Sequence, residues 1–314
     1  MAPEVITVGE ALVEIMRPAA GAPLDQPGMF RGPFASGAPA IFAVAAARLG
    51  AGVGFVGQVG KDAFGRLLCK RLEAEGVNVE HLQVSDENAT AVAFVAYSTD
   101  GNREFVFHLR HAAAGRINPE AIPPEYFSNV KWLHISGSFL ALSDASREIC
   151  SRAVELTRKA GGKISFDPNL RPELMGLEDS RVIFAPYLAI ADLLLPTASE
   201  AHALSGTSDD DEAARRLLGD MERLVVFKRG AEGSTFFAPG KRLDVPGFPV
   251  EEVDPTGAGD CFNAACIIGL MNGWALDRTA RFATAAGALG VTRQGPMEGA
   301  PTAVEIDNFL ESFV

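Results

Sequence analysis

The sequence predicts an α/β fold with a mostly parallel central sheet and a second, smaller β-sheet. Three observations support this prediction. Apolar runs typical of strands alternate with helical patterns along most of the chain. Two β-rich runs interrupt that alternation before residue 115. The 314 residues are enough to bury a large core, with no repeat or linker to divide it. We therefore expect one domain over residues 1–314 with a β lid.

The first elements set the alternation. We expect a strand at Val5–Val8, then an Ala-rich helix at Ile41–Leu49 that Gly50 ends. A strand at Val53–Val59 and a helix at Ala63–Glu75 should follow.

The interruption predicts the lid. Ala91–Ser98 and Glu104–Leu109 are β-rich, and Thr99-Asp100-Gly101-Asn102 between them is typical of a hairpin turn. Parts of residues 10–36 should join this small sheet. The lid would then comprise parts of about 10–36 and 88–115.

The alternation resumes near residue 130. Strands are expected at Trp132–Ser136, Lys163–Phe166, Leu193–Leu195 and Leu224–Lys228. Helices are expected near Ser143–Ala160, Asp179–Ala189, Ser199–Leu204 and Asp209–Leu218. The acidic start of the last helix suits the helix dipole and indicates no catalytic role. A β-type run, Phe248–Val253, should precede an apolar helix at Cys261–Asn272.

Composition narrows the classes of partner. The net charge of −12 argues against nucleic acid, whose phosphates select basic surfaces. No apolar run approaches the ~20 residues that cross a bilayer, and we see no signal peptide. The cysteines Cys69, Cys150, Cys261 and Cys266 show no metal-binding spacing and are expected in the core. These features predict a cytoplasmic protein with no membrane partner.

Two glycine patterns are set aside. Gly52–Gly57 fits G-x-G-x-x-G, but a helix precedes it and the motif itself has strand character, so a nicotinamide site is not expected. Gly60–Gly65 has the spacing of a phosphate-binding P-loop, but Arg66-Leu67 stands where Lys-Ser/Thr is needed.

The pattern that carries chemistry is Asp254-Pro255-Thr256-Gly257-Ala258-Gly259-Asp260. Its small residues lie at the start of an apolar helix, where free N–H groups and the helix dipole attract anions. Asp260 comes directly after them. Its carboxylate would cap the helix or serve as a base, and phosphoryl transfer needs both an anion site and a base.

This motif, with Cys261-Phe262 after it, resembles the C-terminal signature of the ribokinase family, the phosphofructokinase-B type of carbohydrate kinases. The resemblance extends along nearly the whole chain. Four more segments resemble family motifs in the same order: Ser36–Gly50, Gly57–Gly65, Lys228–Gly233 and Ala285–Gly295.

The resemblance implies a ribokinase-like three-layer fold with the lid over a sugar. It makes Asp260 the catalytic base and Gly257, Ala258 and Gly259 the anion hole. The implied ATP-binding residues are Thr197, Lys228, Gly230, Gly233, Thr256, Gly257, Gly259 and Thr284. Magnesium would arrive with ATP, and Asp254 and Thr256 match positions that hold a monovalent cation, usually K⁺, in many members. Members often form a homodimer through the lid.

The resemblance also points to the sugar. Asp167–Pro172 resembles the stretch found in fructokinases and 2-keto-3-deoxygluconate kinases, while tagatose kinase-like members are also similar. Gly37 and Ala38 match substrate positions, and Glu14 stands where relatives often carry a shorter Asp for sugar hydroxyls. Arg171, and Arg110 at the end of a lid strand, are suited to a carboxylate or phosphate. Arg103 is expected in the solvated turn.

Two positions depart from the family. Ile41 stands where members often carry an Asn that binds sugar hydroxyls. Thr197 stands where an Asn precedes Glu200 near the metal, and Glu200 itself is retained.

We therefore predict ATP-dependent phosphorylation of a keto-sugar or keto-sugar acid, such as 2-keto-3-deoxygluconate, fructose or tagatose. A kinase for another sugar or a nucleoside and a non-catalytic sugar-binding protein on the same fold are the alternatives. A nicotinamide dehydrogenase is disfavoured by the misplaced Gly52–Gly57 pattern.

Overall fold

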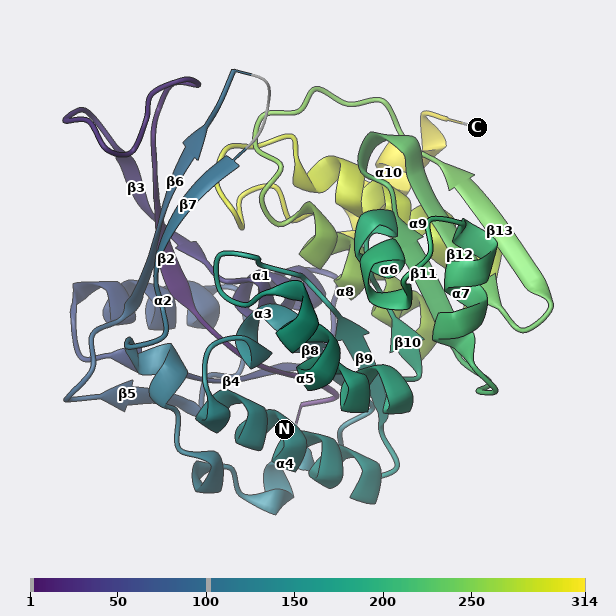
Figure 1. Cartoon of the computed structure of the whole chain (residues 1–314), viewed down its shortest axis with the longest axis horizontal. Helices are drawn as coiled ribbons and strands as arrows, with labels where there is room; N and C mark the ends of the chain where they lie inside the picture. The colour runs from purple at the N-terminus through teal and green to yellow at the C-terminus, as the bar shows by residue number, and fades with distance from the viewer. Residues whose placement is uncertain (1–2, 100–102, 314) are drawn as a thin grey trace.

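The computed structural model describes residues 3–99 and 103–313 and contains two sheets (Figure 1). The large sheet has nine strands in the order β13-β12-β11-β10-β9-β8-β1-β4-β5. Its strands are β1 (Val5–Val8), β4 (Val53–Gly60), β5 (Leu82–Ser85), β8 (Trp132–Ser136), β9 (Lys163–Asp167), β10 (Leu193–Leu194), β11 (Leu224–Lys228), β12 (Gly233–Ala238) and β13 (Lys241–Pro246).

All neighbours from β11 to β5 pair in parallel, and β12 and β13 form an antiparallel edge. Consecutive side chains of a strand therefore enter different layers. Val225 packs into one apolar cluster and Val226 into the other, as a sheet covered on both faces requires.

Helices cover both faces of the large sheet (Figure 1). One layer contains α1 (Ala38–Arg48), α2 (Ala63–Ala74), α8 (Ala258–Met271), α9 (Leu276–Gly290) and α10 (Ala303–Glu311). The other contains α3 (Gly137–Leu140), α4 (Asp144–Lys159), α5 (Leu177–Ile190), α6 (Ala198–Ser205) and α7 (Asp210–Leu218). The part of the chain that the structure describes also contains four short 3₁₀ helices: η1 (Ala113–Arg116), η2 (Pro119–Ala121), η3 (Pro124–Phe127) and η4 (Gly230–Glu232).

The small sheet rises at the upper left of Figure 1. Its order is β3 (Arg31–Ser36), β2 (Leu12–Met16), β6 (Ala91–Tyr97) and β7 (Arg103–His108). Strands β6 and β7 pair antiparallel, as the hairpin pattern predicts. The predicted turn at 99–102 lies mostly outside the described residues. The α/β fold with a small β lid is confirmed, and we call this four-stranded sheet the lid.

One predicted strand is wrong. Phe248–Val253 contains no strand, because Pro249 and the nearby Pro255 lack the N–H that a sheet ladder needs. This segment instead runs past the mouth of the cavity described below. The following helix begins at Ala258, three residues before the predicted start, so Asp260 lies inside its first turn.

Several elements were not anticipated. The pattern did not single out β5, β12, β13 or α10, and it described only the end of α9. By contrast, Gly52–Gly57 does lie largely within a strand, β4, as expected. In the described residues, we find no helix with the length and apolar character that crossing a membrane requires.

The carboxyl ends of β1, β8, β9, β10 and β11 meet at one edge of the large sheet, facing the lid. In open α/β sheets, ligands bind in the crevice beyond these strand ends.

Candidate active site

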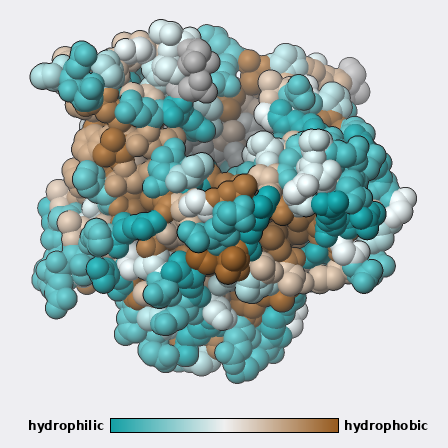
Figure 2. All heavy atoms as spheres, viewed as in Figure 1, coloured by the Kyte–Doolittle hydropathy of each residue, from teal (hydrophilic) through white to brown (hydrophobic). Residues whose placement is uncertain are grey.

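A cavity of about 750 Å³ lies at this edge, between the lid and the start of α8. Figure 2 shows a hollow on this face between the small sheet, at the upper left, and the opposite half of the molecule. Two groups of lining residues face each other across Asp260. We call the first the lid half: Glu10, Glu14, Ser36, Gly37, Ala38, Arg103, Phe105, Phe107, Ser138, Asn169 and Arg171. We call the second the β11 half: Thr197, Glu200, Lys228, Gly230, Gly233, Phe248, Thr256 and Thr284.

The first turn of α8 separates the two halves. Gly257, its N-cap, has φ +87°, and a Cβ there would lie 2.4 Å from the Pro296 carbonyl oxygen, so the position requires glycine. A Cβ on Gly259 would lie 3.5 Å from Lys228 Nζ. The backbone here is therefore open to the cavity, with free N–H groups beside an ammonium, which is an anion site.

Asp260 lies at the third position of this helix and lines the cavity. No residue in the described part of the chain forms a hydrogen bond or ion pair with its carboxylate, and the N-cap has no side-chain cap. Burial raises the pKa of Asp260 well above its ordinary value, and the charges of Asp167 and Glu10 add to this. Lys228 and Arg171 act in the opposite direction. The carboxylate is thus basic and unengaged.

A buried ion pair between Lys228 and Asp167 holds the Lys228 ammonium in the β11 half. Lys228 Nζ donates to Asp167 Oδ2 at 2.6 Å and to Asn263 Oδ1 at 3.3 Å, while Asn263 Nδ2 donates to the same Asp167 oxygen. Although burial pushes the pKa of Asp167 upward, the Lys228 ammonium and its hydrogen bond hold it below the usual value. The ammonium is therefore fixed close to Gly259.

Two buried carboxyl groups line the lid half. Glu10 and Glu14 are each 3% exposed. Burial raises the pKa of both to about 7, and the charge of Asp254 contributes to the shift of Glu14. Ser138 donates to Glu10 Oε1 at 2.7 Å, and Ser36 donates to Glu14 Oε2 at 3.2 Å. The other oxygen of each carboxyl is buried and has no hydrogen-bond partner among residues 3–99 and 103–313.

Arginines face the same space. Arg171 lines the cavity and donates only to the Leu170 carbonyl oxygen, and within the described ranges neither it nor Arg103 has an ion-pair partner. Arg103 is exposed, as expected, but it begins β7 instead of lying in the turn. It lies over the Phe105 ring, 5.5 Å from its centroid, and lines the cavity, which was not expected.

Arg110 does not line the cavity, contrary to expectation. It lies beyond the end of β7, and its guanidinium donates to the Leu174 carbonyl oxygen instead. Side chains of the lid strand alternate between its two faces, so a position read from sequence spacing alone can fall outside the cavity.

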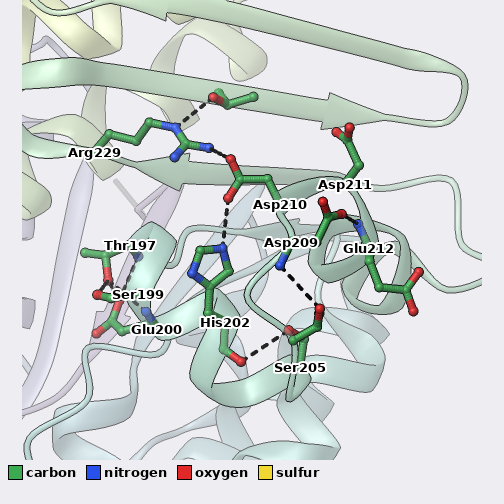
Figure 3. Close-up of polar contacts among 12 residues, drawn as sticks. Thr197, Ser199, Glu200, His202, Ser205, Asp209, Asp210, Asp211, Glu212 and Arg229 are labelled. Carbon is green, nitrogen blue, oxygen red and sulfur yellow. Dashed lines mark hydrogen bonds and ion pairs between the residues drawn. The ribbon is translucent and has the colours of Figure 1, made fainter.

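The β11 half is held by satisfied hydrogen bonds. Arg229 follows Lys228 and, as Figure 3 shows, extends to Asp210 on α7, with 2.6 Å between Nη2 and Oδ2. His202 of α6 meets the other oxygen of Asp210 at 2.8 Å. Thr284 Oγ1 lies 2.8 Å from Ser234 Oγ. These contacts fix the turn at Gly230 between two helices.

Thr197 and Glu200 form a capping box at the start of α6 (Figure 3). Glu200 Oε2 accepts from Thr197 N at 2.7 Å, and Glu200 N donates to Thr197 Oγ1 at 3.2 Å. Glu200 Oε1 also accepts from Leu170 N at 2.7 Å. Both carboxylate oxygens therefore already hold backbone N–H groups, which the sequence motif alone did not reveal.

Asp254 is buried and joins the loop before α8 to the lid. Tyr97 at the end of β6 donates to Asp254 Oδ1 at 2.8 Å and lies 3.2 Å from Thr256 Oγ1. Asp254 Oδ2 accepts from Gly295 N at 3.0 Å. Asp254 itself does not line the cavity, whereas Thr256 does.

The structure thus brings together all predicted site residues except Arg110 and Asp254 in one cavity lining. Sequence reasoning missed Glu10, Arg103, Asn263 and Tyr97. Glu10 carried one usable signal, because it lies two residues beyond the predicted strand Val5–Val8, and the carboxyl ends of parallel strands gather at the binding edge. The others carried none, since only folding brings them to the site.

Comparisons with known proteins agree with this arrangement. Residues 3–303 match the pfkB family carbohydrate kinase model. The chain is 34% identical to a fructokinase of Klebsiella pneumoniae over 302 residues, covering 94% of this chain and 95% of the relative. It is 32% identical to fructokinase-1 of Oryza sativa subsp. japonica over 318 residues, covering 98% of each. A structure solved from E. coli under the name Ribokinase II, with ATP and Mg²⁺, has a TM-score of 0.93 and 39% identity and covers 99% of both chains.

The fold and the cavity therefore define a kinase that transfers phosphate from ATP to a sugar. The chain belongs to the pfkB family of carbohydrate kinases.

Proposed function

We propose that this kinase phosphorylates a hydroxyl of a keto-sugar or keto-sugar acid, with Asp260 as the general base. The observation that carries the proposal is the place of Asp260. Its unpartnered carboxylate lies beside the anion site of α8, between a half with sugar-binding groups and a half with a fixed ammonium. A fructokinase from Vibrio cholerae O395 solved with fructose, ADP and calcium ion supports the substrate class, at TM-score 0.84 and 29% identity over 99% of this chain and 100% of that one.

The reaction needs few groups. Asp260 accepts the proton of the sugar hydroxyl, whose oxygen forms a bond to the γ-phosphorus of ATP. The bond from that phosphorus to the β,γ-bridging oxygen breaks, and ADP leaves. The N–H groups at Gly257, Ala258 and Gly259 bind the transferring phosphate, whose charge the nearby Lys228 ammonium neutralises.

The remaining predicted nucleotide residues lie in the β11 half. We propose that Gly230, Gly233 and Thr284 contact ATP, together with Thr197 and Thr256. The fixed turn and the small residues suit a flat base and its ribose. The structural neighbour with ATP and Mg²⁺ supports this use of the cavity.

Magnesium would be carried by ATP. The described residues contain no group of three or more His, Cys, Asp or Glu side chains that could hold a metal ion. Mg²⁺ usually keeps several waters and binds through substrate phosphates with one or two carboxylates, so the donor set fits such a role. Glu200 lines the cavity, but both of its oxygens already accept backbone N–H groups, so we propose that it holds the backbone near that ion and does not bind it directly.

A K⁺ site at Asp254 and Thr256 stays a proposal. Another structure of the V. cholerae enzyme, at TM-score 0.82, was solved with potassium ion. Here the Tyr97 hydroxyl occupies the side of Asp254 that faces Thr256. A monovalent ion would share or replace that contact.

The charges of the lid half set the sugar class. Arg171 and Arg103 lack carboxylate partners in the described residues, which suits a substrate carboxylate, whereas Glu10 and Glu14 suit hydroxyls. Gly37 and Ala38 let the sugar approach the start of α1. We therefore place keto-sugar acids beside fructose and tagatose as candidate substrates.

We further propose that the enzyme works in the cytoplasm, where ATP and free sugars meet. The lid has open edges at β3 and β7, and an exposed sheet edge favours pairing, so a homodimer through the lid is the expected assembly.

ADP release with ATP and Mg²⁺ tests the proposal. The panel is D-fructose, D-tagatose, 2-keto-3-deoxygluconate, D-ribose and adenosine. We expect the highest kcat/KM with one of the three keto compounds. The highest value with ribose or adenosine would overturn the substrate class, and silence across the panel would favour a binding-only protein.

A further inference from the structure

Glu10 is a buried cavity residue to which no sequence motif assigned a role. It lies two residues beyond the end of β1 and is 3% exposed, yet no atom of the described residues forms a hydrogen bond with its Oε2 atom. Leaving a buried polar atom unpaired is costly, so such atoms in folded proteins usually have a purpose. The carboxyl lines the cavity, so a ligand can supply the missing partner.

A chain of three hydrogen bonds fixes the other oxygen. Asn169 Nδ2 donates to Ser136 Oγ at 3.0 Å, Ser136 and Ser138 lie 2.8 Å apart, and Ser138 donates to Glu10 Oε1 at 2.7 Å. An amide NH₂ group only donates. The arrangement that uses each hydroxyl proton once therefore runs from Asn169 to Glu10, and Oε1 is an acceptor.

The surroundings of Glu10 place it at the reacting end of the cavity. Its charge contributes to the raised pKa of Asp260, and the charge of Arg171 acts on Glu10 in turn. The charge of Arg171 also acts on Glu14, together with those of Asp254 and Arg103. The hydrogen bonds separate the two carboxyls: Ser138, just after β8, holds Glu10, whereas Ser36 of lid strand β3 holds Glu14. The two carboxyls are therefore anchored on different elements around the cavity.

Glu200 shows what a structural carboxyl looks like in this fold. Both of its oxygens accept backbone N–H groups. Within the described residues, no other residue's backbone N–H donates to Glu10, although its own backbone N–H lowers its pKa. Its one side-chain partner is a serine that another serine holds. The two serines orient the Glu10 carboxyl through Oε1, while Oε2 stays available to a ligand in the cavity.

We propose that Glu10 is a substrate-binding residue whose Oε2 atom hydrogen-bonds a sugar hydroxyl near the phosphoryl acceptor, held in place by the Asn169–Ser136–Ser138 chain. This inference rests on the proposed function, since it takes the occupant of the cavity to be a sugar. Ionised, the carboxyl accepts from the hydroxyl; protonated on Oε2, it donates to it.

The test is a cycle between Glu10→Gln and deoxy sugars. With D-fructose, we expect the variant to raise the sugar KM about 10- to 100-fold, as for a lost charge-assisted hydrogen bond. The ATP KM should stay unchanged, kcat should change less than about threefold, and the melting temperature should not fall. Among 1-deoxy-, 3-deoxy- and 4-deoxy-D-fructose, one analogue should show nearly equal KM for both proteins, because it lacks the hydroxyl that Glu10 binds.

Controls separate this role from the alternatives. Glu125→Gln makes the same chemical change at an exposed position outside the cavity and should change nothing. Ser138→Ala removes the donor to Oε1 and should raise the sugar KM by a smaller factor, which keeps the inference testable if Glu10→Gln fails to fold. An unchanged sugar KM in both variants, or an equal rise for every analogue with a lower melting temperature, would overturn the inference.

Turnover of the wild type separates a failure of the proposed substrate class from a failure of the proposed role of Glu10. If the wild type phosphorylates only a sugar without a ketone, the proposed substrate class fails. The same KM ratios, measured with that sugar and its deoxy analogues, then still decide the role of Glu10.

Discussion

The two halves of the cavity are built in opposite ways. In the β11 half, charged side chains have full sets of partners: Glu200 holds two backbone segments, and Arg229 is anchored on Asp210 (Figure 3). In the lid half, Glu10 and Glu14 each keep an unpartnered buried oxygen. Satisfied charges position the backbone, whereas unsatisfied ones await a ligand. This difference supports our proposal that the β11 half positions the nucleotide and the lid half recognises the substrate.

The largest effect should come from the residue between the halves. Asp260→Asn removes the base and keeps its shape, so kcat should fall by about 10²- to 10⁴-fold while ATP affinity stays close to normal. Steady-state kinetics and ATP titration measure the two. Asp307→Asn, an exposed change on α10, is the control. Near-normal turnover by the Asp260 variant would show that Asp260 is not the general base.

A smaller effect is expected within the lid half. Arg171→Ala should raise the KM for 2-keto-3-deoxygluconate about 10- to 100-fold and the KM for D-fructose much less, because only the acid has a carboxylate for the guanidinium. Arg110→Ala is a matched control, since that arginine lies outside the cavity. Equal effects on neutral and acidic sugars would remove the carboxylate role.

The buried carboxyl of Glu10 should also make the free energy of unfolding depend on pH. The folded pKa of Glu10, about 7, exceeds the unfolded value of about 4.3, so the folded state binds more protons between these values. The stabilisation is complete at acid pH and is lost as pH rises through 7. Between pH 5 and pH 8, the wild type without ligand should lose about 2 kcal/mol more than Glu10→Gln. Denaturant unfolding at both pH values checks this, and parallel losses would contradict it.

The β11 half should respond in a simpler way. Glu200→Gln places an amide against the Thr197 N–H and should cost about 1–2 kcal/mol of stability, with little change in Mg²⁺ dependence. Glu305→Gln is a close control, because Glu305 forms the same capping box with Thr302 on α10, away from the cavity. A shift in Mg²⁺ dependence for Glu200→Gln alone would show that Glu200 acts on the metal.

Much of this arrangement was predictable from sequence. The alternation predicted the large sheet, the hairpin pattern predicted the lid, and the glycine motif located Asp260 at the start of a helix. These features are predictable because they depend on residues that lie close together in the chain. The absence of a strand at Phe248–Val253 also has a local cause, because Pro249 lacks the N–H that a sheet ladder needs.

Long-range placement could not be predicted. The pairing of Tyr97 with Asp254 joins residues that the sequence separates widely. The side chains of Arg103 and Arg110 differ in access to the cavity only through the pleat of β7 and the path after it. The role of a charged side chain also depends on its hydrogen-bond partners. The sequence motif around Glu200 does not reveal that its carboxylate oxygens already accept backbone N–H groups.

The most direct test of the central claim is the stoichiometry of the products. Wild-type enzyme with ATP, Mg²⁺ and the best keto-sugar of the panel would be followed by ³¹P NMR. The account predicts ADP and a sugar phosphate in equal amounts, because the phosphate passes to the hydroxyl that Asp260 deprotonates. ADP with inorganic phosphate and no sugar phosphate would contradict it, since the cavity would then deliver water instead of a sugar to the γ-phosphate.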